Sequence, residues 1–426
     1  MKKIKIGVFG VYRGSSMINT FRFTGMAEIV ALCDKWKDAL ERQKEIINDD
    51  SITYYDDFDE FIKHDMDAVV LANYATEHAK FAIKAMKAGK HVYSEVLPCQ
   101  TMQEAVNLIE AVEQTGKIYC YGENFCYLPC TMEMKKLYQN GTIGEFEYGE
   151  GEYVHDCFPY WQSITYGNEN HWRNNMYSTF YCTHAIGPIV HSTGLRPVSV
   201  VGIEGTKNTR NLLVGAKGGQ FGMVLITFEN GGIMKALISC FLKGSSIWYS
   251  LYGSKATIES EREIEGSRGV AGVNLSLKEG EHKCYKVDLD ENLLQFGHYG
   301  SDYHCLSNFI DRLKGNVNAD VIDVYEALDM FLPGMFAYRS ILNGGVKMAV
   351  PNLRNKAERD KYRFDTACVD PAIAKDQLLP TCSLGTPEIN NAVYQSAKEN
   401  WQEEFKKNEG YTKAAFSQGC LDTEEN

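Results

Sequence analysis

The first 125 residues alternate short apolar runs with segments of helical character. The apolar runs lie at 4–9, 28–33, 67–72, 91–95 and 118–121, and the helical segments at 35–47, 76–88 and 101–116. Uninterrupted apolar strands are typical of a parallel sheet covered on both faces. Strand and helix in repeated alternation predict right-handed βαβ units, and therefore an α/β Rossmann domain with a doubly wound parallel sheet over 1–125.

After residue 125 the pattern changes. A helical segment at 131–139 leads into an alternating strand at 145–154, and further strand patterns follow at 198–204, 220–229, 232–241, 246–252 and 273–277. Glycine-containing turns such as Asn230-Gly231-Gly232 separate them. This predicts a C-terminal α+β domain over 126–350 with a large, mostly antiparallel open sheet, closed by helices at 302–314 and 324–341.

The segment 351–426 is polar and irregular. It contains one predicted helix at 386–405, with Pro387 in its first turn. We expect this C-terminal extension to pack on the body of the protein or on a neighbouring subunit.

Composition narrows the classes of function. The chain of 426 residues is 44% hydrophobic and 23% charged, has no apolar run long enough to span a membrane, and begins without a signal-peptide pattern. Its thirteen cysteines show no zinc-type C-x-x-C pairs, which favours reduced thiols and a cytoplasmic location. A net charge of −12 argues against nucleic acid as a partner. The partners that these observations leave are small molecules and other copies of the chain.

The turn after the first strand has part of a dinucleotide-binding pattern. The pattern has three positions for small residues, and Gly10 occupies the first of them. Tyr12 and Ser15 occupy the other two, and Arg13 and Gly14 lie between them. Asp34 ends the second strand 20 residues after Gly14, where an acid binds the adenosine ribose and favours NAD over NADP. The alternatives are a turn role for Asp34 and a Rossmann-like domain without a cofactor.

Three segments together resemble the Gfo/Idh/MocA oxidoreductase family, over roughly 1–350. They are this turn, the segment 73–78 (NYATEH) and the segment 88–95 (AGKHVYSE). The resemblance implies a Rossmann domain followed by an open-faced sheet domain, and usually an oligomer, here a homo-oligomer. Most dehydrogenases of the family carry Glu-Lys-Pro after the fifth strand, whereas this chain has Glu95-Val96-Leu97-Pro98. The lysine that assists removal of the proton from the oxidised hydroxyl is absent, so another group must take that proton.

A narrower match is to the NAD-dependent glycoside hydrolases of this superfamily, such as the bacterial α-N-acetylgalactosaminidases. The ordered motifs lie at 123–127, 149–156, 172–173 and 183–188, and continue at 297–303, 323–325 and 350–351. Departures at Tyr12, Leu97 and Cys182 mean that substrate identity does not carry over. The resemblance implies a sugar or glycoside substrate.

Enzymes of that type oxidise C3 of the sugar, remove the proton at C2, expel the aglycone, add water and reduce C3 again. Because an imidazole titrates near neutral pH, His184 is the first candidate to take the C3 hydroxyl proton. Tyr153 or His155, two apart on one strand and so on one side, removes the C2 proton. Asp156 or Tyr181 contributes to the departure of the leaving group and the addition of water. Core packing for Tyr153 and a solvated strand end for His155 and Asp156 are the alternative interpretations.

The remaining candidates surround the cofactor. They are Asn73, His78, Glu95, Glu123, Trp172 and Arg173. Glu95 and Glu123 are expected near the nicotinamide ribose, and Trp172-Arg173 either clamps a sugar or forms an ordinary interface pair. No metal is predicted, because the spacing of the histidines and cysteines between 155 and 184 matches no compact ligand motif.

Three hypotheses follow. The first is a glycosidase that works by transient C3 oxidation. The second is a net NAD-dependent dehydrogenase of a glycoside, inositol or polyol. The third is a non-catalytic NAD-binding sensor.

Overall fold

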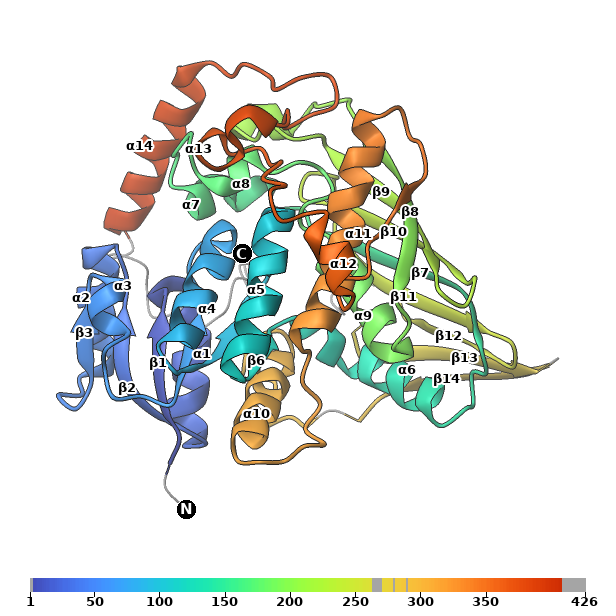
Figure 1. The fold of residues 1–426 in the computed structure, drawn as a ribbon, viewed down its shortest axis with the longest axis horizontal. Coiled ribbons are helices and arrows are strands. Elements are labelled where there is room, and N and C mark those ends of the chain that lie inside the picture. Colours follow the sequence, from blue (N-terminus) through green and yellow to red (C-terminus); the bar gives the residue numbers. More distant parts are fainter. Residues whose placement is uncertain (1–2, 263–269, 279, 289, 408–426) are drawn as a thin grey trace.

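The computed structural model describes residues 3–262, 270–278, 280–288 and 290–407 (Figure 1). Its first sheet has the strand order β3-β2-β1-β4-β5-β6, and every neighbouring pair is parallel. The strands are β1 (Lys5–Phe9), β2 (Glu28–Cys33), β3 (Thr53–Tyr55), β4 (Ala68–Leu71), β5 (His91–Ser94) and β6 (Tyr119–Tyr121). This order is that of a Rossmann sheet, so the predicted doubly wound fold is confirmed.

Helices follow the strands of this sheet. They are α1 (Val11–Thr24), α2 (Lys37–Ile47), α3 (Phe58–Phe61), α4 (His78–Lys87) and α5 (Met102–Thr115). The start of α5 shows why the sequence folds so: Thr101 Oγ1 accepts a hydrogen bond from Glu104 N at 3.1 Å, satisfying a backbone donor that a helix leaves free.

The second sheet has nine strands in the order β14-β13-β12-β11-β7-β10-β9-β8-β15. They are β7 (Phe146–Val154), β8 (Pro197–Gly205), β9 (Phe221–Phe228), β10 (Ile233–Ser239), β11 (Ser246–Gly253), β12 (Thr257–Ser260), β13 (Gly272–Lys278), β14 (Glu281–Lys286) and β15 (Met348–Ala349). Among the described strands of this second sheet, only β7 and β10 pair in parallel. The mostly antiparallel sheet is confirmed.

One face of the second sheet is covered and the other is open. Helices α6 (Pro129–Gln139), α9 (Thr183–Thr193) and α11 (Val324–Leu342) pack on one face of this sheet, and α11 lies between the sheet and the first domain (Figure 1). Side chains exposed on the strands include Ile203, Leu225 and Ile233. The alternation of buried and exposed positions along β9 follows from this one-sided cover.

One helix of the structure was not predicted, and another begins later than predicted. The helix α9 escaped sequence analysis because Gly187 and Pro188 lie inside it, and both residues disfavour a helix interior. The last helix, α14 (Asn391–Lys407), begins at Asn391, not at Thr386. The physical reason is that Asn390 Oδ1 accepts from Ala392 N at 2.9 Å, which caps the helix there.

Later segments complete the first domain. Helix α10 (Ser301–Leu313) packs against α1, and Tyr121 N at the edge of the first sheet donates to Ile322 O at 2.9 Å. Residues far beyond 125 therefore take part in the Rossmann half. This juxtaposition matters because it places a buried carboxylate of α10 beside the dinucleotide turn.

The C-terminal extension packs on the body of its own chain over 351–407. Arg359 forms an ion pair with Glu113 at 2.7 Å and Arg363 with Glu110 at 2.6 Å, both on α5. Short helices α12 (Lys356–Asp360) and α13 (Pro371–Ala374) precede α14. The remainder of the predicted extension, 408–426, lies outside the described residues.

No helix in the described ranges is long and apolar enough to cross a membrane. The cysteines within those ranges are all free thiols.

Candidate functional site

The turn between β1 and α1 is built around two glycines. Gly10 has φ 94°, and a Cβ there would lie 2.5 Å from the carbonyl carbon of Ala72, at the end of β4. At Gly14 a Cβ would lie 2.8 Å from Val8 Cγ1, so this glycine lets α1 pack closely on β1. Close approach of backbone and helix at these two points is what a dinucleotide turn requires.

Asp34 stands at the carboxyl end of β2, beside the start of α1. Its Oδ2 accepts from Val11 N at 2.8 Å and its Oδ1 from Trp36 N at 2.9 Å. Burial raises the pKa of Asp34, while these backbone donors oppose the rise. Each carboxylate oxygen keeps a second lone pair, so Asp34 retains the capacity to accept from a ribose diol.

The predicted residues after β4 divide into two roles. Asn73 Oδ1 is buried and has no hydrogen-bond partner within the described part of the chain. It is therefore an acceptor that a bound ligand could satisfy. His78 is different, because its ring nitrogens lie 2.9 Å from Leu97 O and 3.1 Å from Asn73 O. Burial lowers the pKa of His78 to about 4. This histidine ties two loops together.

Within the first turns of α1, Ser15 and Arg13 are engaged by the protein itself. Ser15 Oγ donates to Tyr12 O at 2.8 Å. Arg13 bridges two carboxylates, with Nη2 2.9 Å from Glu95 Oε1 and Nη1 3.0 Å from Asp302 Oδ2. Arg13 thus joins the turn to β5 and to α10.

Asp302 is a site residue that sequence analysis missed. It is fully buried and accepts hydrogen bonds from Ser16 at 3.0 Å, Asn124 at 2.9 Å and His298 at 3.2 Å, besides Arg13. Burial opposes its ionisation, yet Arg13 and His298 hold the pKa of Asp302 well below its usual range. In the sequence Asp302 reads as an ordinary acid in the first turn of a helix, where the helix dipole favours one.

Glu95 and Asp302 both form ion pairs with Arg13, but the negative charge of Glu95 is less well neutralised by its surroundings. Burial raises the pKa of Glu95 from 4.5 to about 7, although Arg13 opposes the rise and Asp302 adds to it. Between these pH values the folded protein holds a proton that the unfolded chain has released. The free energy of unfolding therefore falls as the pH rises from about 4.5 to about 7.

Replacing Glu95 by glutamine is expected to remove this dependence, because glutamine stays neutral. The stability of the wild type relative to Glu95→Gln should fall by as much as about 3 kcal/mol between pH 4.5 and pH 7. Urea unfolding of both proteins across that range measures the difference. Parallel stability curves would show that Glu95 ionises normally in the fold.

The centre of the site is a group of side chains around His184, here named the His184 cluster: His184, Glu123, Phe125, Tyr153 and Tyr181. His184 Nδ1 lies 2.5 Å from Glu123 Oε1. The imidazole stacks on Phe125, with ring centroids 4.2 Å apart, and lies 4.8 Å from the Tyr153 ring and 5.1 Å from that of Tyr181. Predicted catalytic residues from β7 and α9 thus meet the predicted cofactor neighbour Glu123.

Two features fix the position of this histidine. Tyr249 OH, on β11, donates to the backbone oxygen of His184 at 2.6 Å. Glu123 is fully buried, and its second oxygen, Oε2, has no partner among the described residues. Since the pair with Glu123 occupies Nδ1, Nε2 is the nitrogen left for a reacting group.

The two residues predicted to act at C2 lie together, whereas Asp156, predicted to act on water or the leaving group, turns away from them. Tyr153 OH lies 3.3 Å from His155 Nδ1, and Tyr160 OH lies 2.9 Å from His155 Nε2. Burial raises the pKa of Tyr153 well above its usual range. Asp156 points elsewhere, because it forms an ion pair with Arg210 at 2.9 Å. The structure therefore joins Tyr153 to His155 but not to Asp156.

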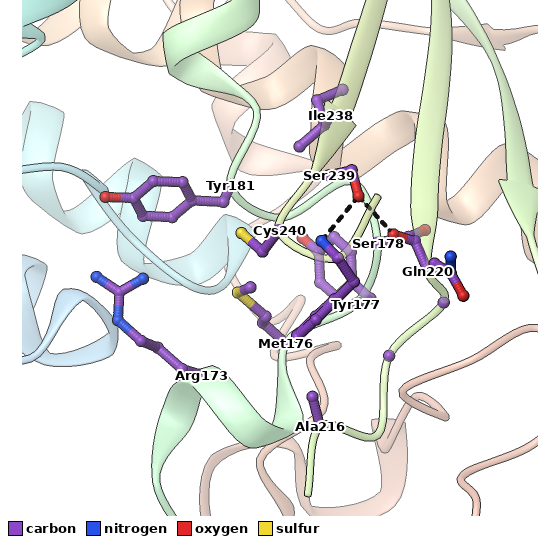
Figure 2. Close-up of a pocket in the computed structure, with 13 residues that line it drawn as sticks. Arg173, Met176, Tyr177, Ser178, Tyr181, Ala216, Gln220, Ile238, Ser239 and Cys240 are labelled. Atoms are coloured by element: carbon purple, nitrogen blue, oxygen red, sulfur yellow. Dashed lines mark hydrogen bonds between the residues drawn. The ribbon is translucent and has the colours of Figure 1, made fainter. Parts of the chain in front are cut away.

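Trp172 and Arg173 lie beside the His184 cluster. The Arg173 guanidinium sits 4.4 Å from the Trp172 ring and 5.3 Å from the Tyr181 ring. Figure 2 shows Arg173 and Tyr181 on one side of a cavity that Cys240 and Ser239 line from another. Its volume of about 20 Å³ holds at most one water, so a sugar must bind outside it.

The described residues contain no group of three or more histidine, cysteine, aspartate or glutamate side chains arranged to hold a metal ion.

Comparisons with known proteins bear on the family and the fold of this chain. Residues 4–123 match the model of the Gfo/Idh/MocA family, described as an oxidoreductase family with an NAD-binding Rossmann fold. A glycosyl hydrolase family 109 protein of Solibacter usitatus is 26% identical over 395 residues, covering 82% of this chain and 88% of that protein. Another family 109 protein, from Phocaeicola vulgatus, is 31% identical over 208 residues, covering 44% of this chain and 38% of that protein.

Among solved structures, an oxidoreductase of Agrobacterium radiobacter in complex with NAD+, L-tartaric acid and magnesium superposes with a TM-score of 0.67 at 16% identity. The match covers 82% of this chain and 99% of that one, and it shows the shared fold. The prediction of NAD as the cofactor is confirmed at the level of the family. The N-terminal domain therefore matches the Gfo/Idh/MocA oxidoreductase family, with the NAD-binding Rossmann fold of that family at residues 4–123.

Proposed function

We propose that the protein is an NAD-dependent glycosidase that cleaves its substrate through transient oxidation at C3 of the sugar. The observation that carries the proposal is the His184–Glu123 pair, 2.5 Å between Nδ1 and Oε1, set among Tyr153 and Tyr181. It supplies a base in a chain that lacks the lysine usual after β5. The similarity to family 109 proteins supports the same choice.

The dinucleotide turn fits the cofactor. Gly10 and Gly14 give the close approach, Asp34 would hold the adenosine ribose, and Asn73 Oδ1 and Glu123 Oε2 are buried acceptors without partners in the described structure. When bound, NAD supplies a hydride acceptor for the oxidation and returns the hydride at the end of the cycle. All other steps need proton transfers, which fall to side chains.

His184 serves the C3 hydroxyl. Its Nε2 accepts the hydroxyl proton as the carbon is oxidised, and it returns a proton when the alcohol is restored. Glu123 orients the ring through Nδ1 and stabilises the imidazolium that forms. Glu123 is thus a positioning residue in the manner of the carboxylate in a catalytic triad.

Tyr153 and His155 together remove the proton from C2 of the sugar. Once C3 is a ketone, the C2 proton becomes acidic, and its removal expels the aglycone from C1. The Tyr153 oxygen accepts that proton after its own has passed to His155, which lies 3.3 Å away and is held by Tyr160 on its other nitrogen. Tyr181, tilted against the Tyr153 ring and stacked on Trp172, borders the place of the leaving group in this proposal.

One observation favours the second candidate, a net dehydrogenase of a glycoside, inositol or polyol. Burial raises the pKa of Tyr153 well above its usual range, so this phenol holds its proton at neutral pH. A protonated phenol is a poor base for C2. Oxidation at C3 needs only His184 and would proceed without Tyr153.

A panel of chromogenic α- and β-glycosides, turned over in D2O with and without added NAD, tests the choice. We expect aglycone release with catalytic NAD and deuterium at C2 of the product. Tyr153→Phe should lose the exchange while single-turnover formation of NADH persists. Stoichiometric NADH from an intact glycoside would support the dehydrogenase. Aglycone release without deuterium at C2 would contradict the elimination route.

A further inference from the structure

Helix α14 is fixed on the second domain by close backbone contact. Gly167, which follows α7 (Trp161–Thr165), faces it directly: a Cβ there would lie 2.7 Å from Lys398 Cα and 2.8 Å from Tyr394 O. Tyr394 is buried, and its hydroxyl donates to Gly215 O at 2.8 Å. The position of α14 on the second domain is therefore fixed by specific contacts.

The far end of α14 reaches the first domain. Trp401 lies 5.9 Å from Trp36 and 5.4 Å from Tyr166 between ring centroids, and Trp36 lies 5.5 Å from Tyr166. These three residues, here named the aromatic triad, come from the Rossmann domain, the loop after α7 and the C-terminal extension. Figure 1 shows α14 beside α7 and above α2, as these contacts require.

The aromatic triad stands at the place where a doubly wound fold binds adenosine. Trp36 is two residues beyond Asp34, at the carboxyl end of β2, and its amide donates to that carboxylate at 2.9 Å. Tyr74 follows β4, and its ring lies 4.8 Å from His171 of the second domain. Ligands of such sheets bind outside the carboxyl ends of the strands. The triad and Tyr74 therefore border the adenosine end of the site.

We propose that α14 is part of the NAD site and acts as a clamp that closes its adenosine end and slows NAD release. The inference rests on the NAD dependence of the proposed function. Trp401 holds Trp36 against the second domain, so the two domains cannot part at this edge without breaking the aromatic triad. A cofactor that is restored in every turnover has no need to leave, which suits a clamp.

The comparison structure matches most, but not all, of this chain. The Agrobacterium oxidoreductase is covered over 99% of its length, yet 82% of this chain is matched, which leaves 18% without a counterpart. This chain therefore carries residues beyond the part that it shares with that NAD+ complex.

Trp401→Ala tests the clamp, with Gln402→Ala as the matched control, because Gln402 is the exposed neighbour on the same helix. Stopped-flow release of NADH gives the dissociation rate, and calorimetry gives Kd for NADH, ADP-ribose and nicotinamide mononucleotide. We expect Trp401→Ala to speed NADH release and weaken ADP-ribose roughly three- to tenfold, the range of an aromatic contact. Mononucleotide binding and the control should stay unchanged, and Trp401→Phe should restore slow release.

Several results would overturn the clamp. An unchanged NADH dissociation rate in Trp401→Ala is one, and an equal loss of mononucleotide affinity, which indicates general damage, is another. In either case C2 exchange and turnover by the wild type would leave the proposed function standing. If the wild type binds no dinucleotide, the proposed function and the clamp both fail.

Discussion

Replacing His184 by alanine is expected to lower kcat roughly 100- to 10,000-fold, the usual contribution of general acid–base catalysis. The substitution removes Nε2, the nitrogen that takes the C3 hydroxyl proton, whereas the dinucleotide turn is untouched. Single-turnover formation of NADH and steady-state release of aglycone measure the loss, with NADH affinity as the internal check. A non-catalytic sensor would keep all its cofactor-dependent behaviour in this variant.

Alanine also leaves the buried Glu123 without its 2.5 Å partner, which costs stability. His184→Asn is therefore the sharper variant, because its amide N–H can replace the bond to Glu123 while offering nothing in the place of Nε2. We expect its melting temperature to stay closer to that of the wild type and its kcat to be as low as that of the alanine variant. Full activity in His184→Asn would assign the C3 proton to another residue.

Replacing Gly151 by alanine is expected to destabilise the protein by roughly 2–4 kcal/mol and to lower activity with it. A Cβ at Gly151 of β7 would overlap the backbone oxygen of Ala185 and lie 3.0 Å from its carbonyl carbon. Ala185 follows His184 on α9, so the helix that carries the base must move away from the strand that carries Tyr153. Chemical denaturation and kcat of the folded variant measure the two effects.

Gly149→Ala is the matched control, two residues earlier on the same strand. A Cβ there would lie 3.0 Å from the Phe146 ring and 3.1 Å from Ser250 O, which small adjustments can relieve. We expect a smaller loss of stability and nearly unchanged kcat. Equal effects of the two substitutions would mean that strand strain, and not the displacement of α9, is responsible.

The Rossmann domain could be predicted from the sequence because its signals are local. The apolar run 28–33 became β2 with its bounds unchanged, and the cap at Thr101 placed the start of α5. Gly10 and Asp34 were found because they lie at fixed distances along a single βαβ unit. For the same reason the resemblance identified His184, Tyr153 and Glu123 as candidates by their motifs.

Other parts of the site depend on segments distant in sequence. Asp302 reaches Arg13 across 289 positions, and although the motif at 297–303 contains it, nothing in that motif indicates its contact with Arg13. Asp156 was a reasonable candidate beside His155, but its side chain turns to Arg210. Helix α9 was missed because its stability comes from complete burial, which compensates for the glycine and proline inside it.

The sequence by itself therefore determined the two kinds of sheet, the dinucleotide turn and the residue types available for proton transfer, because periodicity and short-range spacing encode them. Only the tertiary structure decided which nitrogen of His184 is left for a reacting group, which two carboxylates hold Arg13, and where Trp401 meets Trp36. Those facts arise from contacts between surfaces brought together by packing, and packing is a property of the whole chain.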